Sequence, residues 1–498
     1  MGLNFVDLAV IVVYLVGVTA FGLHFRKKQR TIKDYFLADN TIPWWAISLS
    51  IVAAETSTLT IISVPGLAYE KDFGFLQLVI GYLIGRVIVS FLLIPQYFRG
   101  ELVTAYQLIE RRFGQKLRSL TAGLFLITRA AAEGVRVFAV AIVVGIALSS
   151  LLSGLGDFGR DVAAIGIVTL LTLVYTFEGG MAAVIWTDVV QLAIYVMGTL
   201  VGVFTLLRLV PGGWSTIQGV AGEAGKFRVF HFSWDFYSTY TFWSGVIGGA
   251  FLTTASHGTD QLIVQRLLSA RSERQAKLAL ITSGVVVLFQ FSLFLLIGAM
   301  LFVFYRMSPP AVAFIRTDTI FPGFVVTQMP HVISGLLISA ILAAAMSNLS
   351  AALNSLSSTT IVDFYGRWWP RASEQFRVRL SRFATIGWAI VLFVLAIVAR
   401  HGGKVLEVGL SIASVAYGSL LGVFLLGVLT RRASERGAMV GMLFGFLLNL
   451  YLWLFTRVPF TWYVALGSCA TVFVGYAVSR LLSSTPTQTF EAPAGRSN

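Results

Sequence analysis

Charged residues are scarce in this chain of 498 residues. They make up 12% of it, whereas 57% of the residues are hydrophobic and the mean hydropathy is +0.82. Because soluble proteins carry about 25% charged residues, a water-soluble globular protein is excluded. The few charges gather between apolar stretches of ~20 residues, the length that crosses a bilayer as a helix. The composition therefore predicts a polytopic membrane protein embedded in a lipid bilayer.

Alternation of apolar and polar residues is missing as well. Outer-membrane barrels alternate over segments of ~10 residues, but runs such as residues 137–152 do not alternate. Membrane-spanning strands are therefore excluded, and the expected fold class is an all-α polytopic membrane protein.

The chain also lacks the residues of most catalytic and cofactor sites. Its single cysteine, Cys469, lies in an apolar stretch, which leaves neither a disulfide nor a thiol metal site. Its five histidines are scattered along the chain, and no Gly-rich GK[ST] loop occurs. We expect no enzyme activity and no organic cofactor.

The net charge of +14 and the pI near 10.0 raise the question of a polyanionic partner. The Lys and Arg residues flank the membrane segments, however, where cytoplasmic loops normally collect them. We therefore expect no nucleic-acid partner, and no obligate protein partner is evident from the sequence.

Apolar segments of spanning length recur along the whole chain, about thirteen in all. Basic residues follow the first segment at 26–33 and recur at Arg111-Arg112, at Arg377 and at Arg431-Arg432, always on the same side. By the positive-inside rule, the N-terminus lies outside and the C-terminus in the cytoplasm, and we expect a bacterial inner membrane. The segments lie at about 5–25, 42–69, 74–97, 119–150, 161–177, 183–209, 239–258, 279–305, 331–362, 382–399, 405–429, 437–456 and 460–482.

Two of these segments have polar centres at membrane depth. Residues 53–60, which precede Pro65-Gly66, and residues 253–258 are rich in Ser and Thr. Interrupted helices in corresponding halves of a chain indicate a transporter built from inverted repeats, with its binding site at the midplane. Close packing of small residues between helices is the alternative interpretation.

Four motifs resemble those of the sodium/solute symporter family, which includes sodium/glucose cotransporters, the bacterial proline symporter and sialic acid transporters. GGMAAVIWTDVVQ at residues 179–191 resembles the family signature. TAYQLIERRF at 104–113, GTDQLIVQR at 258–266 and AMSNLS at 345–350 resemble its first large cytoplasmic loop, the end of its sixth core helix and its eighth core helix. The motifs follow the family's order and cover nearly the whole chain.

The resemblance implies a five-plus-five inverted-repeat core of the leucine-transporter type. Residues 1–30 would hold an extra N-terminal helix, 42–209 core helices one to five, 239–430 core helices six to ten, and 437–482 two extra helices. Residues 483–498, rich in Ser, Thr and Pro, are expected to form a disordered cytoplasmic tail.

The resemblance also implies a sodium site between the first and eighth core helices. Its ligands would be the carbonyls of Ala53, Thr56 and Ala344 and the side chains of Ser347 and Asn348. Irregular backbone that lines an enclosed cavity can present such carbonyls to a cation. The family more often has Ser or Thr at position 348, but the Asn amide still offers an oxygen. Hydrogen bonding between helices is the alternative role for these hydroxyl side chains.

Two acids lie near the path that the resemblance assigns to sodium. Asp188, at the cytoplasmic end of core helix five, would attract sodium leaving toward the cytoplasm, or would only cap and solvate a helix end. Glu55 falls where the proline symporter has a carboxylate that influences sodium binding. An ion pair between Glu55 and a neighbouring helix is equally consistent.

The third core helix carries Arg129, Glu133 and Arg136 on one face. Ionised groups at this depth pair or line a wet cavity, and Glu133 neutralises one arginine but not both. A surplus guanidinium would bind a carboxylate through two hydrogen bonds, and the resemblance aligns Arg136 with a position that faces ligand in sugar and sialic acid transporters. A purely structural Arg-Glu-Arg network is the alternative.

The other expected pocket residues are small and polar. Thr60 and Thr253 stand where sugar carriers of the family place Gln and Asn, and Ser256 replaces their inner-gate tyrosine, which weighs against a sugar. His257 would otherwise be a hydrogen-bonded histidine at a helix end. The expected substrate-binding residues are Ser57, Thr58, Thr60, Arg136, Thr253 and His257.

These features predict a secondary transporter that couples sodium, the only metal expected, to the import of a small organic solute by alternating access. The solute expected is a carboxylate such as an amino acid or a monocarboxylate. The alternatives are a sodium/sugar symporter of the same family, or a sensor or channel built on the same scaffold.

Overall fold

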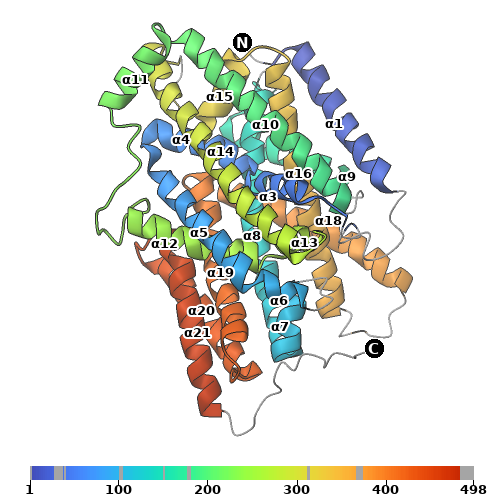
Figure 1. Ribbon diagram of the computed structural model, residues 1–498. Coiled ribbons are helices and arrows are strands. Elements are labelled where there is room, and N and C mark those ends of the chain that lie inside the picture. Colours follow the sequence, from blue (N-terminus) through green and yellow to red (C-terminus); the bar gives the residue numbers. More distant parts are fainter. Residues whose placement is uncertain are drawn as a thin grey trace.

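The structure is a computed structural model that describes residues 3–26, 38, 41–99, 105–149, 152–175, 181–310, 314–365, 369 and 374–482. Every regular element in these ranges is a helix (Figure 1). The expected tail at 483–498, most of the basic cluster at 26–33, and parts of two motifs, Thr104 and Gly179-Gly180, lie outside the described residues.

Long apolar helices make up most of the described chain. Nine spans in the described ranges are long and apolar enough to cross a membrane. The span at 73–98 is built from η2 (Phe73–Phe75), α5 (Leu76–Leu92) and α6 (Ile94–Phe98). The other eight lie in α8 (Gln115–Ala147), α10 (Met181–Leu209), α14 (Glu273–Met307), α16 (Ile333–Thr359), α18 (Glu374–Ala399), α19 (Val405–Leu429), α20 (Glu435–Phe455) and α21 (Tyr463–Leu482).

A bent pair of helices is together long and apolar enough to form a tenth span among the described residues. α3 (Trp44–Glu55) and α4 (Thr58–Glu70) meet at an angle of 65°. The remaining apolar segments of the sequence are occupied by α1 (Phe5–Arg26), α9 (Asp157–Tyr175) and α12 (Phe242–Gly258). Every predicted segment therefore contains a helix, and the all-helical fold class is confirmed. Short helices connect the spans: α7 (Ala105–Phe113), α11 (Gly213–Glu223), α13 (Gln261–Leu268) and α15 (Ile320–Gln328).

The bend between α3 and α4 has a local cause in the polar residues of the sequence. The last helical hydrogen bond of α3 runs from the Thr56 N–H to the Val52 carbonyl at 2.8 Å, and the Thr56 hydroxyl donates to the same carbonyl at 2.7 Å. Ser57 then adopts an extended conformation and becomes the N-cap position of α4. Ser and Thr offer the backbone such alternatives to the helical hydrogen bond, so the interruption falls where the polar residues predicted it.

Glycines hold α12 close against α5. A Cβ atom on Gly249 would lie 2.3 Å from the Leu78 carbonyl oxygen, and one on Gly85 would lie 2.8 Å from Cβ of Thr253. Small residues in membrane helices let two backbones approach this closely. The contact fixes the half of α12 that carries Thr253 and His257.

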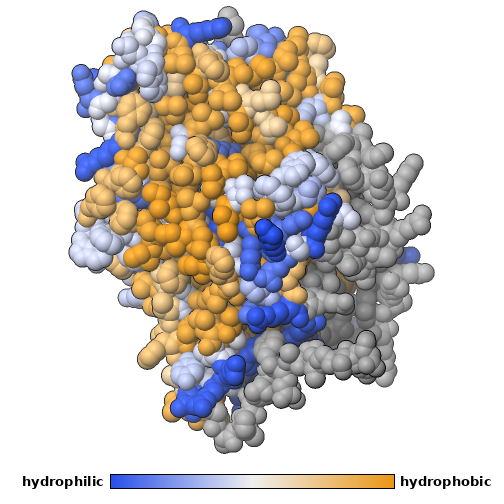
Figure 2. Space-filling model, viewed as in Figure 1, coloured by the Kyte–Doolittle hydropathy of each residue, from blue (hydrophilic) through white to orange (hydrophobic). Residues whose placement is uncertain are grey.

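The outer surface of the helix bundle is apolar. Figure 2 shows a broad band of hydrophobic side chains on one face, with hydrophilic side chains gathered toward the upper left, right of the centre and toward the lower edge. Large hydrophobic residues on several outer helices are strongly exposed, among them Phe289 at 71%, Phe383 at 71% and Phe473 at 77%. Such a surface fits lipid rather than water.

Candidate functional site

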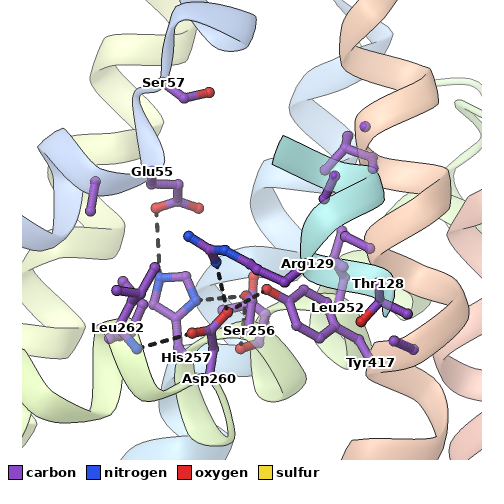
Figure 3. Close-up of a pocket in the computed structure, with 18 of the residues that line it drawn as sticks. Glu55, Ser57, Thr128, Arg129, Leu252, Ser256, His257, Asp260, Leu262 and Tyr417 are labelled. Carbon is purple, nitrogen blue, oxygen red and sulfur yellow. Dashed lines mark hydrogen bonds and ion pairs between the residues drawn. The ribbon is translucent and has the colours of Figure 1, made fainter. Parts of the chain in front are cut away.

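A cavity lies beside the break between α3 and α4 (Figure 3). Its walls come from the break, from α8, from α12 and the turn that follows it, and from α19. In Figure 3, Glu55 on the break, Arg129 on α8, His257 and Asp260 at the end of α12, and Tyr417 on α19 gather around the same space. The break and the helices around it therefore bring their polar residues to one place. The interruption expected at 253–258 is absent, because α12 is a continuous helix through Gly258.

Most of the predicted site residues meet here. A second, smaller cavity adjoins the first and is lined by Thr58. Ser57, Glu133, Arg136 and Asn348 line both cavities. The predicted residues that line the main cavity are Glu55, Ser57, Thr60, Arg136, Thr253, His257 and Asn348. Ala53, Thr56, Ala344, Ser347 and Asp188 are not among the residues that line either cavity.

The break frees two backbone carbonyls. A continuous helix would bond the N–H of Ser57 to the Ala53 carbonyl, but this N–H is bonded to the Glu55 carbonyl at 2.9 Å. In the same way, the N–H of Thr60 is bonded to the Ser57 carbonyl at 2.9 Å rather than to that of Thr56. Ala53 and Thr56 are the residues whose carbonyls were predicted to bind sodium, and both carbonyls have lost the donor that a continuous helix provides.

The opposite side of the predicted sodium site lies on α16. Ala344 is buried, while Ser347 and Asn348 are partly exposed. Asn348 lines the small cavity together with Ser57 and Thr58 of the break, whereas Ala344 and Ser347 do not line it. Uncharged oxygens of carbonyl, hydroxyl and amide groups suit a hard monovalent cation, and these residues fit sodium.

Arg129 and Arg136 of α8 form a network with two acids. Glu133 Oε1 lies 2.9 Å from Arg129 Nη2 and 3.1 Å from Arg136 Nη1. Arg129 Nη1 also lies 3.9 Å from Asp260 Oδ2, which accepts a hydrogen bond of 2.7 Å from the Tyr417 hydroxyl. In the sequence, Glu133 was the only acid identified to neutralise the charges of Arg129 and Arg136. The fold brings a second acid, Asp260, next to Arg129. The Arg129 side chain is 9% exposed and that of Arg136 is 33% exposed, so Arg136 is the arginine open to the cavity.

Glu55 forms an ion pair with Arg86 of α5. Arg86 is fully buried, and its guanidinium also contacts His257 Nε2 at 3.3 Å. His257 is 3% exposed and its Nδ1 lies 2.9 Å from the Ser256 hydroxyl. The ion pair with a neighbouring helix is the second of the two roles expected for Glu55. Arg86 was missed from sequence, because a single arginine in an apolar helix carries no motif that identifies its partner.

Asp188 is part of a separate buried group. Its Oδ2 accepts hydrogen bonds from Ser50 of α3 at 2.6 Å and from Arg266 of α13 at 3.0 Å. Asp188 is only 5% exposed, so it does not solvate a helix end. These two hydrogen bonds join α3, α10 and α13. Arg266 also lines the main cavity, and this link was not visible in the sequence.

Comparison with known proteins identifies relatives along the whole chain. The sodium/sialic acid symporter SiaT of Proteus mirabilis is 31% identical over 494 residues, which cover 96% of each chain. The sodium-dependent multivitamin transporter of Oryctolagus cuniculus is 29% identical over 456 residues, 90% of this chain and 70% of that protein. The human sodium/iodide cotransporter is 28% identical over 454 residues, 89% of this chain and 69% of that protein.

Solved structures share the fold. A substrate-bound, outward-open Na+-coupled sialic acid symporter matches with a TM-score of 0.81 at 29% identity, covering 96% of this chain and 98% of that one. The nucleobase-cation-symport-1 transporter Mhp1 in a closed conformation matches with a TM-score of 0.56 at 14% identity, covering 92% of this chain and 96% of that one, and so shares the fold alone.

The family model of the sodium:solute symporter family matches residues 35–445 of this chain. The expected resemblance is therefore confirmed. With its apolar helices and its sodium-coupled relatives, the protein is an integral membrane transporter that couples sodium to a solute, and it is not an enzyme. This chain belongs to the sodium:solute symporter family.

Proposed function

We propose that this protein imports a carboxylate-bearing solute together with sodium, and that Arg136 binds the carboxylate. The observation that carries the proposal is the pairing and the exposure of the Arg136 side chain. Its guanidinium shares Glu133 Oε1 with Arg129, yet its side chain is 33% exposed at the junction of the two cavities. A guanidinium has five N–H donors, and those not used by Glu133 can hold a carboxylate through two parallel hydrogen bonds.

The sodium is proposed to bind between the break and α16. The ligands are the freed carbonyls of Ala53 and Thr56, the Ala344 carbonyl, and the side chains of Ser347 and Asn348. Support comes from the displaced N–H groups of Ser57 and Thr60 and from the cavity that Asn348 shares with the break. Sodium at this position would lie near the solute, so that each ligand favours binding of the other.

Other cavity residues complete the proposed substrate site. Ser57, Thr58, Thr60, Thr253 and His257 supply hydroxyl and imidazole groups around the solute, and Glu55 fixes the end of α3 through Arg86. Asp188 is proposed to attract sodium on its way to the cytoplasm once its pairing with Arg266 loosens.

The sodium gradient is a sufficient energy source. One sodium ion that moves through ~100 mV gains ~2.3 kcal/mol, and a tenfold concentration gradient adds ~1.4 kcal/mol. For a zwitterionic solute such as an amino acid, the sum supports accumulation by several hundredfold. A monoanion that moves with one sodium transfers no net charge, so only the concentration gradient drives it, to about tenfold. We place the protein in a bacterial inner membrane with its N-terminus outside, in agreement with the distribution of basic residues.

A second candidate is a neutral solute such as a sugar. Asp260 beside Arg129 brings the network of two arginines to two acids, and a network balanced in this way does not need an anion. The greater exposure of Arg136 favours the carboxylate, because a purely structural arginine would be expected to be as enclosed as Arg129.

Uptake into proteoliposomes tests the proposal. The labelled panel holds amino acids, short monocarboxylates, sialic acid, pantothenate and glucose, each measured with and without an inward sodium gradient. We expect sodium-driven accumulation of one or more carboxylates. Accumulation of glucose alone would refute the role of Arg136 and favour the second candidate.

A further inference from the structure

Two buried oxygen atoms beside Arg136 have no hydrogen-bond partner within the described residues. They are Glu133 Oε2 and Thr58 Oγ1, and their residues are 1% and 4% exposed. Proteins leave few buried polar atoms unpaired, because the loss of their hydrogen bonds with water is costly. Within the part of the chain that the structure describes, these two atoms are therefore free to bond a polar group of a solute or the water that such a group displaces.

Both residues line the small cavity, which Ser57, Arg136 and Asn348 also border. The cavity has room for about one water-sized group. Because Ser57, Glu133, Arg136 and Asn348 also line the main cavity, a solute in the main cavity can extend one small polar group into the smaller one.

The chemistry of the cavity selects the kind of group. An ionised carboxylate only accepts hydrogen bonds, and Glu133 Oε1 already serves Arg129 at 2.9 Å and Arg136 at 3.1 Å. Its Oε2 therefore needs a donor, and the Thr58 hydroxyl can accept from the same donor. A second carboxylate would be repelled by Glu133, and the Ala53, Thr56 and Ala344 carbonyls proposed to hold sodium belong to residues that do not line this cavity.

The short distance between Arg136 and Glu133 brings the two binding groups close together. Arg136 Nη1 and Glu133 Oε1 are 3.1 Å apart, and a carboxylate on Arg136 and a donor on Glu133 can be carried by adjacent atoms of one small molecule. We infer that the solute is an α-hydroxy or α-amino carboxylate, whose hydroxyl or ammonium group binds Glu133 Oε2 and Thr58 Oγ1. This inference rests on the proposed function, since it takes Arg136 to hold the carboxylate.

The test compares matched solutes. The best-transported carboxylate of the panel is compared with its analogue in which hydrogen replaces the α-hydroxyl or α-ammonium group; for short acids, these are lactate or alanine against propionate. A site built to hydrogen-bond such a group discriminates strongly against a solute that lacks it. We expect sodium-driven uptake, measured as kcat/KM, to favour the α-substituted solute by about a hundredfold or more.

Variants of Thr58 test whether the small cavity causes the preference for the α-substituted solute. Thr58→Val keeps the shape of the side chain and removes its hydroxyl, and it should reduce the preference about tenfold, while Thr58→Ser should retain most of it. Thr128→Val is the matched control, because Thr128 lines the main cavity but its hydroxyl is bonded to the Leu124 carbonyl at 2.7 Å. Its preference should equal that of the wild type.

The outcomes separate the two levels of inference. If the best carboxylate has no α-donor, or if its deoxy or deamino analogue is transported equally well, the inference about Glu133 and Thr58 is wrong while the carboxylate proposal stands. A preference that Thr58→Val and Thr128→Val reduce equally would also overturn the assignment. If no carboxylate is accumulated, the proposed function itself fails, and the inference fails with it.

Discussion

At the scale of single residues, Arg129 and Arg136 of α8 differ in how their surroundings pair and enclose them. Arg129 lies between Glu133 and Asp260 and is nearly enclosed, whereas Arg136 has one shared acid and faces the cavity. Position along the helix predicted that both share a face. Only the fold, which places Asp260 after α12 at 3.9 Å from Arg129, decided which of them is open to a solute.

Replacement of Arg136 by Gln should raise KM for carboxylate solutes about a hundredfold. The variant loses a bidentate, charge-assisted pair, and hydrogen bonds to charged groups contribute about 1.5–3 kcal/mol each. Initial rates of sodium-driven uptake over a range of solute concentrations measure the change. Arg136→Lys keeps the charge but not the planar guanidinium with its paired donors. Its KM should therefore lie between those of the wild type and Arg136→Gln. Unchanged affinity in Arg136→Gln would favour the structural network.

Replacement of Ser347 by Ala should raise the sodium concentration for half-maximal uptake roughly tenfold, because one oxygen ligand is removed. The measurement is uptake of the best solute at graded external sodium. Asn348→Ser should keep or lower that concentration, since it restores the residue type that the family more often has. The control is Ser292→Ala on α14, whose hydroxyl is bonded to the Leu288 carbonyl at 2.8 Å. Equal sodium dependence in Ser347→Ala and wild type would remove Ser347 from the site.

At the scale of helices, the contact between α5 and α12 decides where the cavity wall lies. It depends on glycines whose missing side chains leave room for the opposite backbone. Their spacing in the sequence did not identify α5 as the partner of α12, since small residues mark a close contact without naming the other helix.

Replacement of Gly249 by Val should lower the stability of the protein by about 3 kcal/mol or more, because a Cβ atom would lie 2.3 Å from the Leu78 carbonyl oxygen. Thermal unfolding of the detergent-purified protein measures the effect. Gly219 of α11 is the matched control: nothing lies within 4 Å of a Cβ placed there, and Gly219→Ala should be neutral or stabilise slightly. Equal midpoints for Gly249→Val and wild type would contradict the close packing.

At the scale of the whole molecule, α19 is bonded on both sides of the cavity. Near its start, the Tyr240 hydroxyl donates to Glu407 at 2.9 Å, and the Val405 N–H donates to Asp318 at 3.3 Å. Further along, Tyr417 is bonded to Asp260 at 2.7 Å. Alternating access requires that a solute reach the cavity from each side in turn, so these two sets of contacts cannot both persist through the transport cycle.

Replacement of Glu407 by Gln should open the side of the cavity where α19 begins. Loss of a hydrogen bond to a charged group shifts such an equilibrium by about tenfold. The measurement is the labelling rate of Thr60→Cys by an impermeant thiol reagent outside intact cells, with Cys469, the chain's single cysteine, changed to Ser. Asp161→Asn is the control, because Asp161 pairs with Arg400 at 2.6 Å without involving α19. A labelling rate that Glu407→Gln leaves unchanged would show that this contact does not control access.

The sequence by itself determined the membrane class, the all-helical fold, the family and the position of the break. These follow from local properties: the length of apolar runs, the scarcity of charge, the polar residues at 53–60 and motifs that stay contiguous in the chain. Ala53 and Thr56 were accessible in this way, because the hydrogen bonds that free their carbonyls are made by residues within four positions.

Only the tertiary structure decided how the charged residues pair. Arg86 meets Glu55, Asp260 meets Arg129 and Arg266 meets Asp188 across separations of 31, 131 and 78 residues. A buried charge requires a partner, but the requirement does not name it, since several acids and bases lie at membrane depth. The choice follows from which helices pack together, and that packing sets which arginine, Arg136, remains open to a solute.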